Sequence, residues 1–283
     1  MNYSVAHKNG TQILSDAGIP EAALDARLLL EFITGKERDY LLVHPEEKLG
    51  TAEEKNYMRL LAKRAEHVPL AHLTGTCCFM GIDFRVSDKV LIPRQDSECL
   101  VEEAMRYTDD GSEILDLCTG SGCLLLSLMH YKNGCRGVGV DISEDALIIA
   151  RENHSVLDAS GGLNGGSAEF IAGDMFSAVP GRKFDVIISN PPYIRTDVIE
   201  TLMPEVRDHD PRIALDGGAD GLAFYRRIAE SAREHLNSGG FAAVEIGYDQ
   251  AEDVAKIFED AGFSRIETVK DYGGNDRVIV VRI

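Results

Sequence analysis

Four consecutive residues, Asn190-Pro191-Pro192-Tyr193, have the types and order needed for one specific chemistry. The two prolines fix φ and lack a backbone N–H, so the neighbourhood of Asn190 is rich in acceptors: its side-chain carbonyl and the carbonyl of Pro191. Two acceptors can hold both N–H bonds of one NH₂ group. An amide nitrogen, or an amine on a heteroaromatic ring, shares its lone pair with the π-system and is a poor nucleophile. Holding its N–H bonds favours pyramidalisation and orients the lone pair toward an electrophile.

The preceding residues place this tetrapeptide where ligands bind in open α/β sheets. Residues 184–189 are an apolar run typical of a buried strand, and ligands gather beyond the carboxyl ends of such strands. We expect Tyr193 to pack against the planar group that carries the NH₂. The alternative is a rigid proline turn after a buried strand, without chemistry.

A second chemical element lies upstream, where the apolar segment Ile114-Leu115-Asp116-Leu117 runs into Cys118-Thr119-Gly120-Ser121-Gly122. Gly120 and Gly122 let the backbone approach a ligand closely. Free N–H groups at the start of the following helix favour a negative charge, such as the carboxylate of S-adenosylmethionine. The spacing departs from the dinucleotide fingerprint, because Leu125 stands where Gly or Ala is required. An ordinary tight turn is the alternative.

Two acidic residues at the ends of the next strands support a cofactor site. Asp141 stands about 20 residues beyond the glycine turn, where an acid accepts hydrogen bonds from ribose hydroxyls; otherwise it caps the helix that follows. Asp174 could accept the exocyclic amine of adenine, with Met175 covering one ring face; Met175 could instead be a core residue. These residues predict a site for S-adenosylmethionine, whose sulfonium methyl is the electrophile.

The elements that must position these residues alternate between strand and helix from residue 113 onward. This alternation predicts a doubly wound, mostly parallel seven-stranded α/β sheet with helices on both faces. The last two strands are joined only by residues 271–276, too few for a helical crossover, so the last strand should be antiparallel. The expected strands are 114–117, 137–140, 169–172, 184–189, 240–246, 264–269 and 277–281. The expected helices between them are 124–130, 146–157, 222–236 and 250–260.

Residues 1–72 differ in texture and predict a small N-terminal helical domain. Its helices include one carrying Leu24, Leu28, Phe32 and Ile33 at helical spacing, with Thr34-Gly35 as its stop. Another is expected over 51–66, with Thr51 as N-cap.

Residues 73–94 predict a connecting hairpin that turns near Gly81. The third region, 95–283, is the expected catalytic domain. It begins with a helix that Asp96 or Ser97 caps and that runs to about Tyr107.

Composition limits the function classes. The net charge is −18, which disfavours nucleic-acid binding and favours a protein or small-molecule substrate. No apolar run approaches the ~20 residues of a membrane span, and the N-terminus lacks the pattern of a signal peptide. Six cysteines without a Cys-x-x-Cys pair indicate free thiols, and eight histidines show no metal-ligand spacing. We therefore expect a cytoplasmic protein without a metal site or membrane partner.

Two further segments make the sequence resemble a known family. Residues 91–98, Leu-Ile-Pro-Arg-Gln-Asp-Ser-Glu, resemble the Ile-Pro-Arg-x-Asp-Thr-Glu segment of the PrmC/HemK family of peptide chain release factor glutamine methyltransferases. Residues 210–222 resemble that family's Glu-Pro-x-x-Ala-Leu-x-Gly-Gly-x-Asp-Gly-Leu. The likeness covers nearly the whole chain and implies the Rossmann-like fold of class I methyltransferases.

The resemblance implies methyl transfer from S-adenosylmethionine to the side-chain amide nitrogen of the glutamine in the Gly-Gly-Gln tripeptide of release factors, leaving S-adenosylhomocysteine. Residues 1–72 would help to bind the release factor. The implied cofactor contacts are Cys118, Thr119, Gly120, Ser121, Gly122, Asp141, Asp174, Met175 and Asn190. The implied catalytic and substrate-binding residues are Asn190, Pro191, Pro192 and Tyr193.

Three positions depart from the family pattern, and three other functions stay open. Cys118 stands where Gly is common, Gln95 where Pro is usual, and Met175 where an aromatic residue often covers adenine. One alternative function is a nucleic-acid adenine N6 methyltransferase, which faces the same nitrogen chemistry but is expected to carry a basic or aromatic target-reading region. The others are a glutamine methyltransferase acting on a ribosomal protein and a scaffold without activity.

Overall fold

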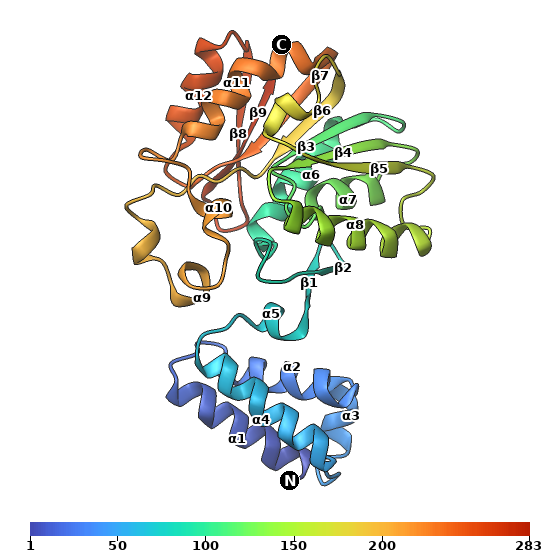
Figure 1. Ribbon diagram of the computed structural model, residues 1–283, viewed down its shortest axis with the longest axis vertical. Coiled ribbons are helices and arrows are strands. Elements are labelled where there is room, and N and C mark those ends of the chain that lie inside the picture. Colours follow the sequence, from blue (N-terminus) through green and yellow to red (C-terminus); the bar gives the residue numbers. More distant parts are fainter. The chain divides into compact units, whose positions relative to one another are not determined.

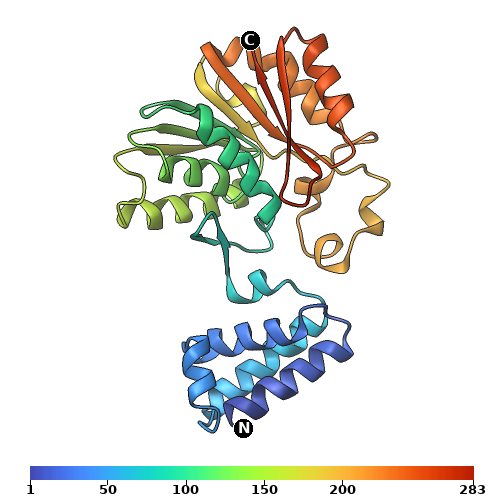
Figure 2. The ribbon, with the colours of Figure 1, turned by 180° about the vertical axis from the view of Figure 1, so that it is seen from behind.

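A computed structural model describes residues 1–283 and divides them into two compact units (Figures 1 and 2). The helical unit comprises Met1–Thr76 and Met203–His209, and the sheet unit comprises Cys77–Leu202 and Asp210–Ile283. No helix of the chain combines the length and the apolar character needed to cross a bilayer.

The helical unit is held together where helices α1, α2 and α4 cross. Tyr57 is fully buried there, and its hydroxyl donates a hydrogen bond of 2.9 Å to the carbonyl of Ala26. Gly10 permits this approach, because a Cβ at that position would lie 2.3 Å from the Tyr57 hydroxyl oxygen. The helices of this unit are α1 (Tyr3–Asp16), α2 (Ala22–Thr34), α3 (Arg38–Val43), α4 (Thr51–Ala65), α5 (Leu70–Thr74) and α9 (Pro204–Arg207).

Helix α2 ends at Gly35 as predicted, with φ of 63°, but the apolar residues whose spacing indicated the helix do not form its buried face. Leu24 and Phe32 are exposed, whereas Ala26, Leu29 and Leu30 form the packed face. Small residues allow α1 and α4 to approach, so the larger side chains of the other stripe remain at the surface.

The predicted cap of α4 was also wrong. Gly50, not Thr51, is the N-cap, and its N–H donates a hydrogen bond of 2.7 Å to the carboxylate of Glu53. The Glu53 carboxylate thus satisfies a free N–H of the first turn from within the helix.

A partly buried ion cluster attaches the 203–209 segment to the other helices of this unit. Arg64 donates to Asp25 at 2.7 Å and to Glu205 at 3.3 Å, and His67 Nδ1 lies 3.1 Å from the same Glu205 oxygen. Because removing one member would leave a buried charge without its partner, the cluster specifies where this segment packs. No sequence pattern indicates that residues 203–209 belong with the helical unit.

The sheet unit has the predicted seven-stranded sheet, in the order β5-β4-β3-β6-β7-β9-β8. All neighbouring strands are parallel except β9, which is antiparallel to both β7 and β8. The prediction of a mostly parallel sheet with an antiparallel last strand is confirmed. The strands are β3 (Glu113–Leu117), β4 (Arg136–Asp141), β5 (Ser167–Ala172), β6 (Phe184–Ser189), β7 (Leu236–Glu245), β8 (Arg265–Lys270) and β9 (Asp276–Arg282).

Helices cover both faces of this sheet (Figures 1 and 2). Alternate residues of β6 separate the two cores: Val186 and Ile188 pack with α6, α7 and α8, whereas Ile187 packs with α11 and α12. The helices are α6 (Glu98–Tyr107), α7 (Cys123–His130), α8 (Glu144–Ala159), α10 (Arg212–Leu215), α11 (Ala223–His235) and α12 (Ala251–Asp260), with the 3₁₀ turns η1 (Gln95–Ser97), η2 (Met175–Ala178) and η3 (Ile199–Thr201). A separate hairpin, β1 (Thr76–Phe79) and β2 (Ile82–Arg85), turns through Met80 and Gly81 as predicted.

The order of strands reverses between β3 and β6. From β3 the chain continues outward through β4 and β5, whereas β6 and β7 lie on its other side. Ligands bind at such a switch point, beyond the carboxyl ends of the two central strands. Both chemical segments predicted from the sequence, the glycine turn and the Asn190 tetrapeptide, follow these two strand ends.

Candidate functional site

The glycine turn adopts a left-handed backbone at three positions. Cys118, Gly120 and Gly122 have φ of 60°, 54° and 78°, and α7 begins directly afterward. A left-handed conformation costs a residue with a Cβ roughly 1 kcal/mol, which explains why glycine suits the position of Cys118. A Cβ at Gly120 would meet no atom within 4 Å, so this side of the turn faces open space.

Asp116 supports the turn from within the sheet. Its side chain is fully buried, and the Thr119 hydroxyl donates a hydrogen bond of 2.5 Å to it. Burial raises the pKa of Asp116 to about 7. Asp116 was expected in the strand before the turn and had no predicted role, since a residue that supports a turn from below shows no distinguishing pattern.

Asp141 links the turn to the end of β4. Its carboxylate accepts hydrogen bonds of 2.9 Å from the N–H of Gly120 and from the N–H of Ser143. The side chain that caps α8 is Ser143, which accepts from the N–H of Ala146, so the alternative of Asp141 as the helix cap is not what the structure has. Burial raises the pKa of Asp141. Each carboxylate oxygen keeps a lone pair that a ribose hydroxyl could use.

Asp174 and Met175 follow β5, and each has a neighbour that the sequence did not indicate. Asp174 is half-exposed and pairs with Arg227 of α11 at 2.7 Å. Met175 is buried in the core that contains α11 and also lines the pocket, and its contact with adenine stays a prediction. Arg227 was missed because it belongs to an ordinary amphipathic helix more than 50 residues away.

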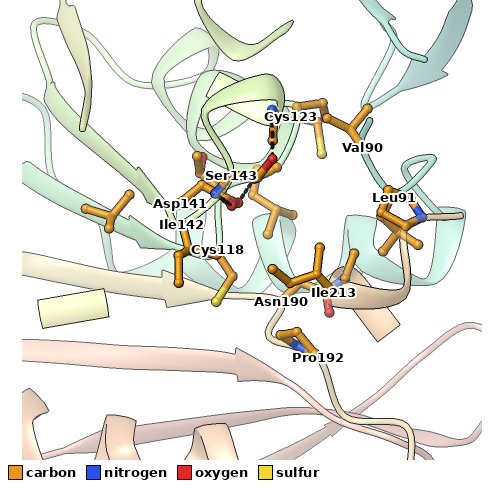
Figure 3. A pocket seen from close by; sticks show the side chains of 18 of the residues that line it. Val90, Leu91, Cys118, Cys123, Asp141, Ile142, Ser143, Asn190, Pro192 and Ile213 are labelled. Carbon is orange, nitrogen blue, oxygen red and sulfur yellow. Dashed lines mark hydrogen bonds between the residues drawn. The ribbon is translucent and has the colours of Figure 1, made fainter. Parts of the chain in front are cut away.

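A cavity of about 250 Å³ joins these residues (Figure 3). In Figure 3, Cys118, Asp141 and Ile142 lie on one side of the pocket and Asn190, Pro192 and Ile213 on another. The predicted residues that line it are Cys118, Thr119, Gly120, Ser121, Asp141, Asp174, Met175, Asn190 and Pro192, whereas Gly122, Pro191 and Tyr193 do not.

The residues that line the cavity have the chemical types needed to bind S-adenosylmethionine. The Asp141 carboxylate can accept from hydroxyls, Met175 and Ile142 offer apolar surface to a base, and the cations Lys89 and Arg94 can pair with a carboxylate. Arg94 also donates to buried Asp210 at 2.7 Å and thereby joins the 91–98 and 210–222 segments. These two segments supplied the family resemblance, and residues from both line the cavity.

Asn190 has one defined amide orientation. Its Nδ2 donates to the Ser97 hydroxyl at 3.2 Å, and no donor of the chain occupies its carbonyl oxygen. The carbonyl oxygen of Pro191 likewise accepts no hydrogen bond from the chain. The Asn190 carbonyl oxygen is therefore available to an NH₂ group in the cavity, whereas Pro191 is not among the residues that line it, and its role as the second acceptor stays a prediction.

Tyr193 does not lie where we expected. Its hydroxyl donates to buried Glu245 at 3.1 Å, and its ring packs against the core around Tyr225 instead of lining the pocket. Burial of an aromatic ring and a partner for its hydroxyl favour this inward position. Tyr193 thus anchors the loop of residues 190–193 and does not form the wall of the pocket.

A glycine-rich segment packs behind this loop. A Cβ at Gly217 would lie 2.7 Å from the Cα of Tyr193, and one at Gly221 would lie 2.5 Å from the Tyr193 carbonyl oxygen. Gln250 donates to that same carbonyl at 3.0 Å. The resemblance drew attention to residues 210–222, but only the structure gives the reason: these glycines let two backbones lie in contact.

Comparisons with known proteins agree with this architecture. Residues 6–75 match the family model of the PrmC N-terminal domain, and residues 95–205 match that of the methyltransferase small domain. The release factor glutamine methyltransferase of Caulobacter vibrioides is 41% identical over 269 residues, covering 94% of this chain and 91% of that protein. The enzyme of the same name from Agrobacterium fabrum is 42% identical over 275 residues, covering 95% and 93%. A methyltransferase structure from Pyrococcus furiosus, 18% identical, superposes with a TM-score of 0.54 over 82% of this chain and 98% of that chain and shares its fold.

The position of Asp141 generates a prediction about cofactor affinity. Asp141→Ala should weaken the binding of S-adenosylmethionine by about tenfold or more, because it removes both the ribose acceptor and the acceptor for Gly120 N–H. Isothermal titration calorimetry measures the dissociation constant. Asp158→Ala, which removes an exposed carboxylate near the end of α8, is the matched control. Equal affinities of the Asp141 variant and the parent would contradict the assignment.

The raised pKa of Asp116 generates a prediction about pH. Protonated Asp116 is favoured in the folded state, so its contribution to stability is complete below about pH 4 and is lost as the pH rises through about 7. The Asp116→Asn variant lacks this titration, so the free energy of unfolding of the parent should fall relative to that of the variant across this range. Urea unfolding at several pH values measures the difference. A difference that does not change with pH would refute the prediction.

Proposed function

The chain belongs to the family of release factor glutamine methyltransferases, and from this we propose that it transfers a methyl group to the side-chain amide nitrogen of the glutamine in the Gly-Gly-Gln tripeptide of release factors. The chain is an S-adenosylmethionine-dependent methyltransferase. One observation supports the proposal at the level of individual atoms. The side-chain nitrogen of Asn190 donates a hydrogen bond to Ser97, so the side-chain carbonyl oxygen of Asn190 remains free to bind the substrate.

The chemistry that the chain must supply is orientation. Bound S-adenosylmethionine provides an electrophilic methyl group on a sulfonium sulfur. Asn190 Oδ1 and the Pro191 carbonyl accept the two N–H bonds of the glutamine amide, which directs its lone pair away from both acceptors. The same two dipoles stabilise the positive charge that develops on the nitrogen as the new N–C bond forms. No strong base is required before methyl transfer: the S–C bond of the donor breaks as the N–C bond forms, and the cationic amide then loses one N–H proton to solvent.

The apolar surroundings of the 190–193 loop strengthen hydrogen bonds to the two acceptor carbonyl groups. Pro191 and Pro192 are buried, and Pro192, Ile213 and Phe224 contribute to the walls of the cavity. Two fixed acceptors in such surroundings interact more strongly with an amide NH₂ than they would in water. The pocket is also lined by the glycine turn, so the two reactants can be held side by side.

We assign recognition of the release factor to the helical region, residues 1–72. Apolar side chains at its surface support this role: Leu24 and Phe32 are exposed on α2, and Leu42 and Val43 are exposed on α3. Exposed apolar side chains of this kind support binding of another protein when they lie together at the surface. Release factors act in translation, and six free cysteines suit a reducing compartment, so we propose that the enzyme is cytoplasmic.

The role of Asn190 gives the central test of the proposed function. Asn190→Ala should lower the rate of methyl transfer by about a hundredfold or more, because one of the two acceptors that orient the nitrogen is lost. Tandem mass spectrometry of a purified release factor before and after incubation locates the methyl group on the Gly-Gly-Gln glutamine. Asn164→Ala, at an exposed loop position, is the control. Methylation of a ribosomal protein or of DNA instead of the release factor would overturn the proposed substrate.

The role of the helical region is tested separately. The pair Leu24→Ser and Phe32→Ser should raise KM for the whole release factor by about fivefold or more, since apolar contacts carry much of the energy of protein recognition. KM for a short Gly-Gly-Gln peptide should not change, because a peptide is expected to contact only the sheet unit. Val156→Ser, at an exposed apolar position of α8, is the control. Equal effects on both substrates would refute the assignment.

A further inference from the structure

Ser97 contacts the side chain of Asn190, and its hydroxyl forms a hydrogen bond with that side chain instead of with the backbone of the following helix. It precedes α6 in the position of an N-cap, yet its side chain makes no capping hydrogen bond, contrary to the expectation that Asp96 or Ser97 caps this helix. Ser97 is 3% exposed, and its oxygen accepts the hydrogen bond from Asn190 Nδ2. The Ser97 hydroxyl therefore binds Asn190 in the site and does not cap helix α6.

The orientation of the Asn190 amide decides whether the site works. The two ends of an asparagine side chain have nearly the same shape and differ in hydrogen bonding: one end accepts and the other donates. If the amide were reversed, its NH₂ would face the NH₂ of the substrate, and donor would oppose donor. An acceptor on the far side of the nitrogen distinguishes the two orientations.

Buried Glu245 lies near the Ser97 hydroxyl. Glu245 is 1% exposed at the end of β7 and accepts the Tyr193 hydroxyl with Oε1, whereas its Oε2 has no donor in standard hydrogen-bond geometry. Ser97 is near enough to Glu245 to lower the pKa of its carboxyl, although burial raises that pKa overall. If the Ser97 hydroxyl points its proton toward the Glu245 carboxylate, its oxygen lone pairs face the other way. They can then accept the hydrogen bond from Asn190 Nδ2.

Charged residues from the end of the sheet hold the segment that contains Ser97. Arg277 pairs with Asp96 at 3.4 Å and with Asp271 at 3.0 Å, and it donates to the carbonyl of Ile246. Arg277 is 9% exposed and its pair with Asp271 is buried, whereas the Asp96 side chain of the other pair lies at the surface. The position of Ser97 relative to the end of β7 is thus fixed by strands and not by a free loop.

We propose that Ser97 is a positioning residue that sets the amide orientation of Asn190, and that Glu245 orients the Ser97 hydroxyl for this task. The proposal rests on the function proposed above and adds a specificity determinant for an NH₂ group. Ser97 lines the cavity and Glu245 does not. Both act through the side chain of Asn190.

Kinetics of Ser97 variants test the proposal. Ser97→Ala should lower kcat on a release factor by about tenfold or more, because the amide of Asn190 loses the bond that selects its orientation. Its dissociation constant for S-adenosylmethionine should change less than about twofold, as measured by calorimetry. Ser97→Thr keeps the hydroxyl and should retain most of the parent rate. Ser127→Ala removes another buried hydroxyl, in α7 and outside the pocket, and should behave like the parent.

A second variant covers the case in which Ser97→Ala does not fold. Glu245→Gln places a donor where Ser97 needs an acceptor, so it should also lower kcat while cofactor binding is preserved. Full activity of either Ser97→Ala or Glu245→Gln would overturn the proposal, as would equal loss in Ser97→Thr and Ser97→Ala. A parent enzyme that leaves the release factor unlabelled would overturn the proposed function instead, so the two failures are distinguishable.

Discussion

The parallel register between β3 and β6 is the constraint on which the site depends. Leu117 pairs with Ser189 as the last residue of each strand, and the Ser189 hydroxyl donates to the carbonyl of Leu117 at 2.7 Å. The next residues are Cys118, which begins the cofactor turn, and Asn190, which begins the acceptor loop. A shift of either strand by one residue would turn its side chains to the opposite face. The meeting of methyl donor and amide is therefore set by the central pair of strands.

The contacts behind the 190–193 loop have a common effect: they occupy the other hydrogen-bonding groups of the loop. Tyr193 donates its hydroxyl to Glu245, its carbonyl accepts from Gln250, and Asn190 gives its NH₂ to Ser97. Two carbonyl oxygens of the loop, Asn190 Oδ1 and that of Pro191, accept no hydrogen bond from the chain, and each can accept one from a substrate N–H. A substrate amide must supply two N–H bonds at once, which disfavours groups with a single N–H or O–H.

Short-range patterns in the sequence were enough to predict the sheet, its antiparallel last strand and nine of the residues that line the pocket. These patterns did not predict the position of a side chain whose partners lie far away in the sequence. Tyr193 turned inward because Glu245, 52 residues later, offers a partner. Leu24 and Phe32 remained exposed because Gly10 and Tyr57 fix how the helices pack. Helical spacing identifies a stripe of apolar residues but cannot say which stripe another helix covers.

A crystal structure with S-adenosylhomocysteine and a Gly-Gly-Gln peptide tests the central claim most directly. The glutamine nitrogen should lie within about 3.2 Å of both Asn190 Oδ1 and the Pro191 carbonyl oxygen, with the sulfur of the cofactor product on the open side of the nitrogen. A glutamine whose amide oxygen, rather than its nitrogen, faces Asn190 would contradict the account. So would a peptide bound with its amide outside the cavity between the glycine turn and the 190–193 loop.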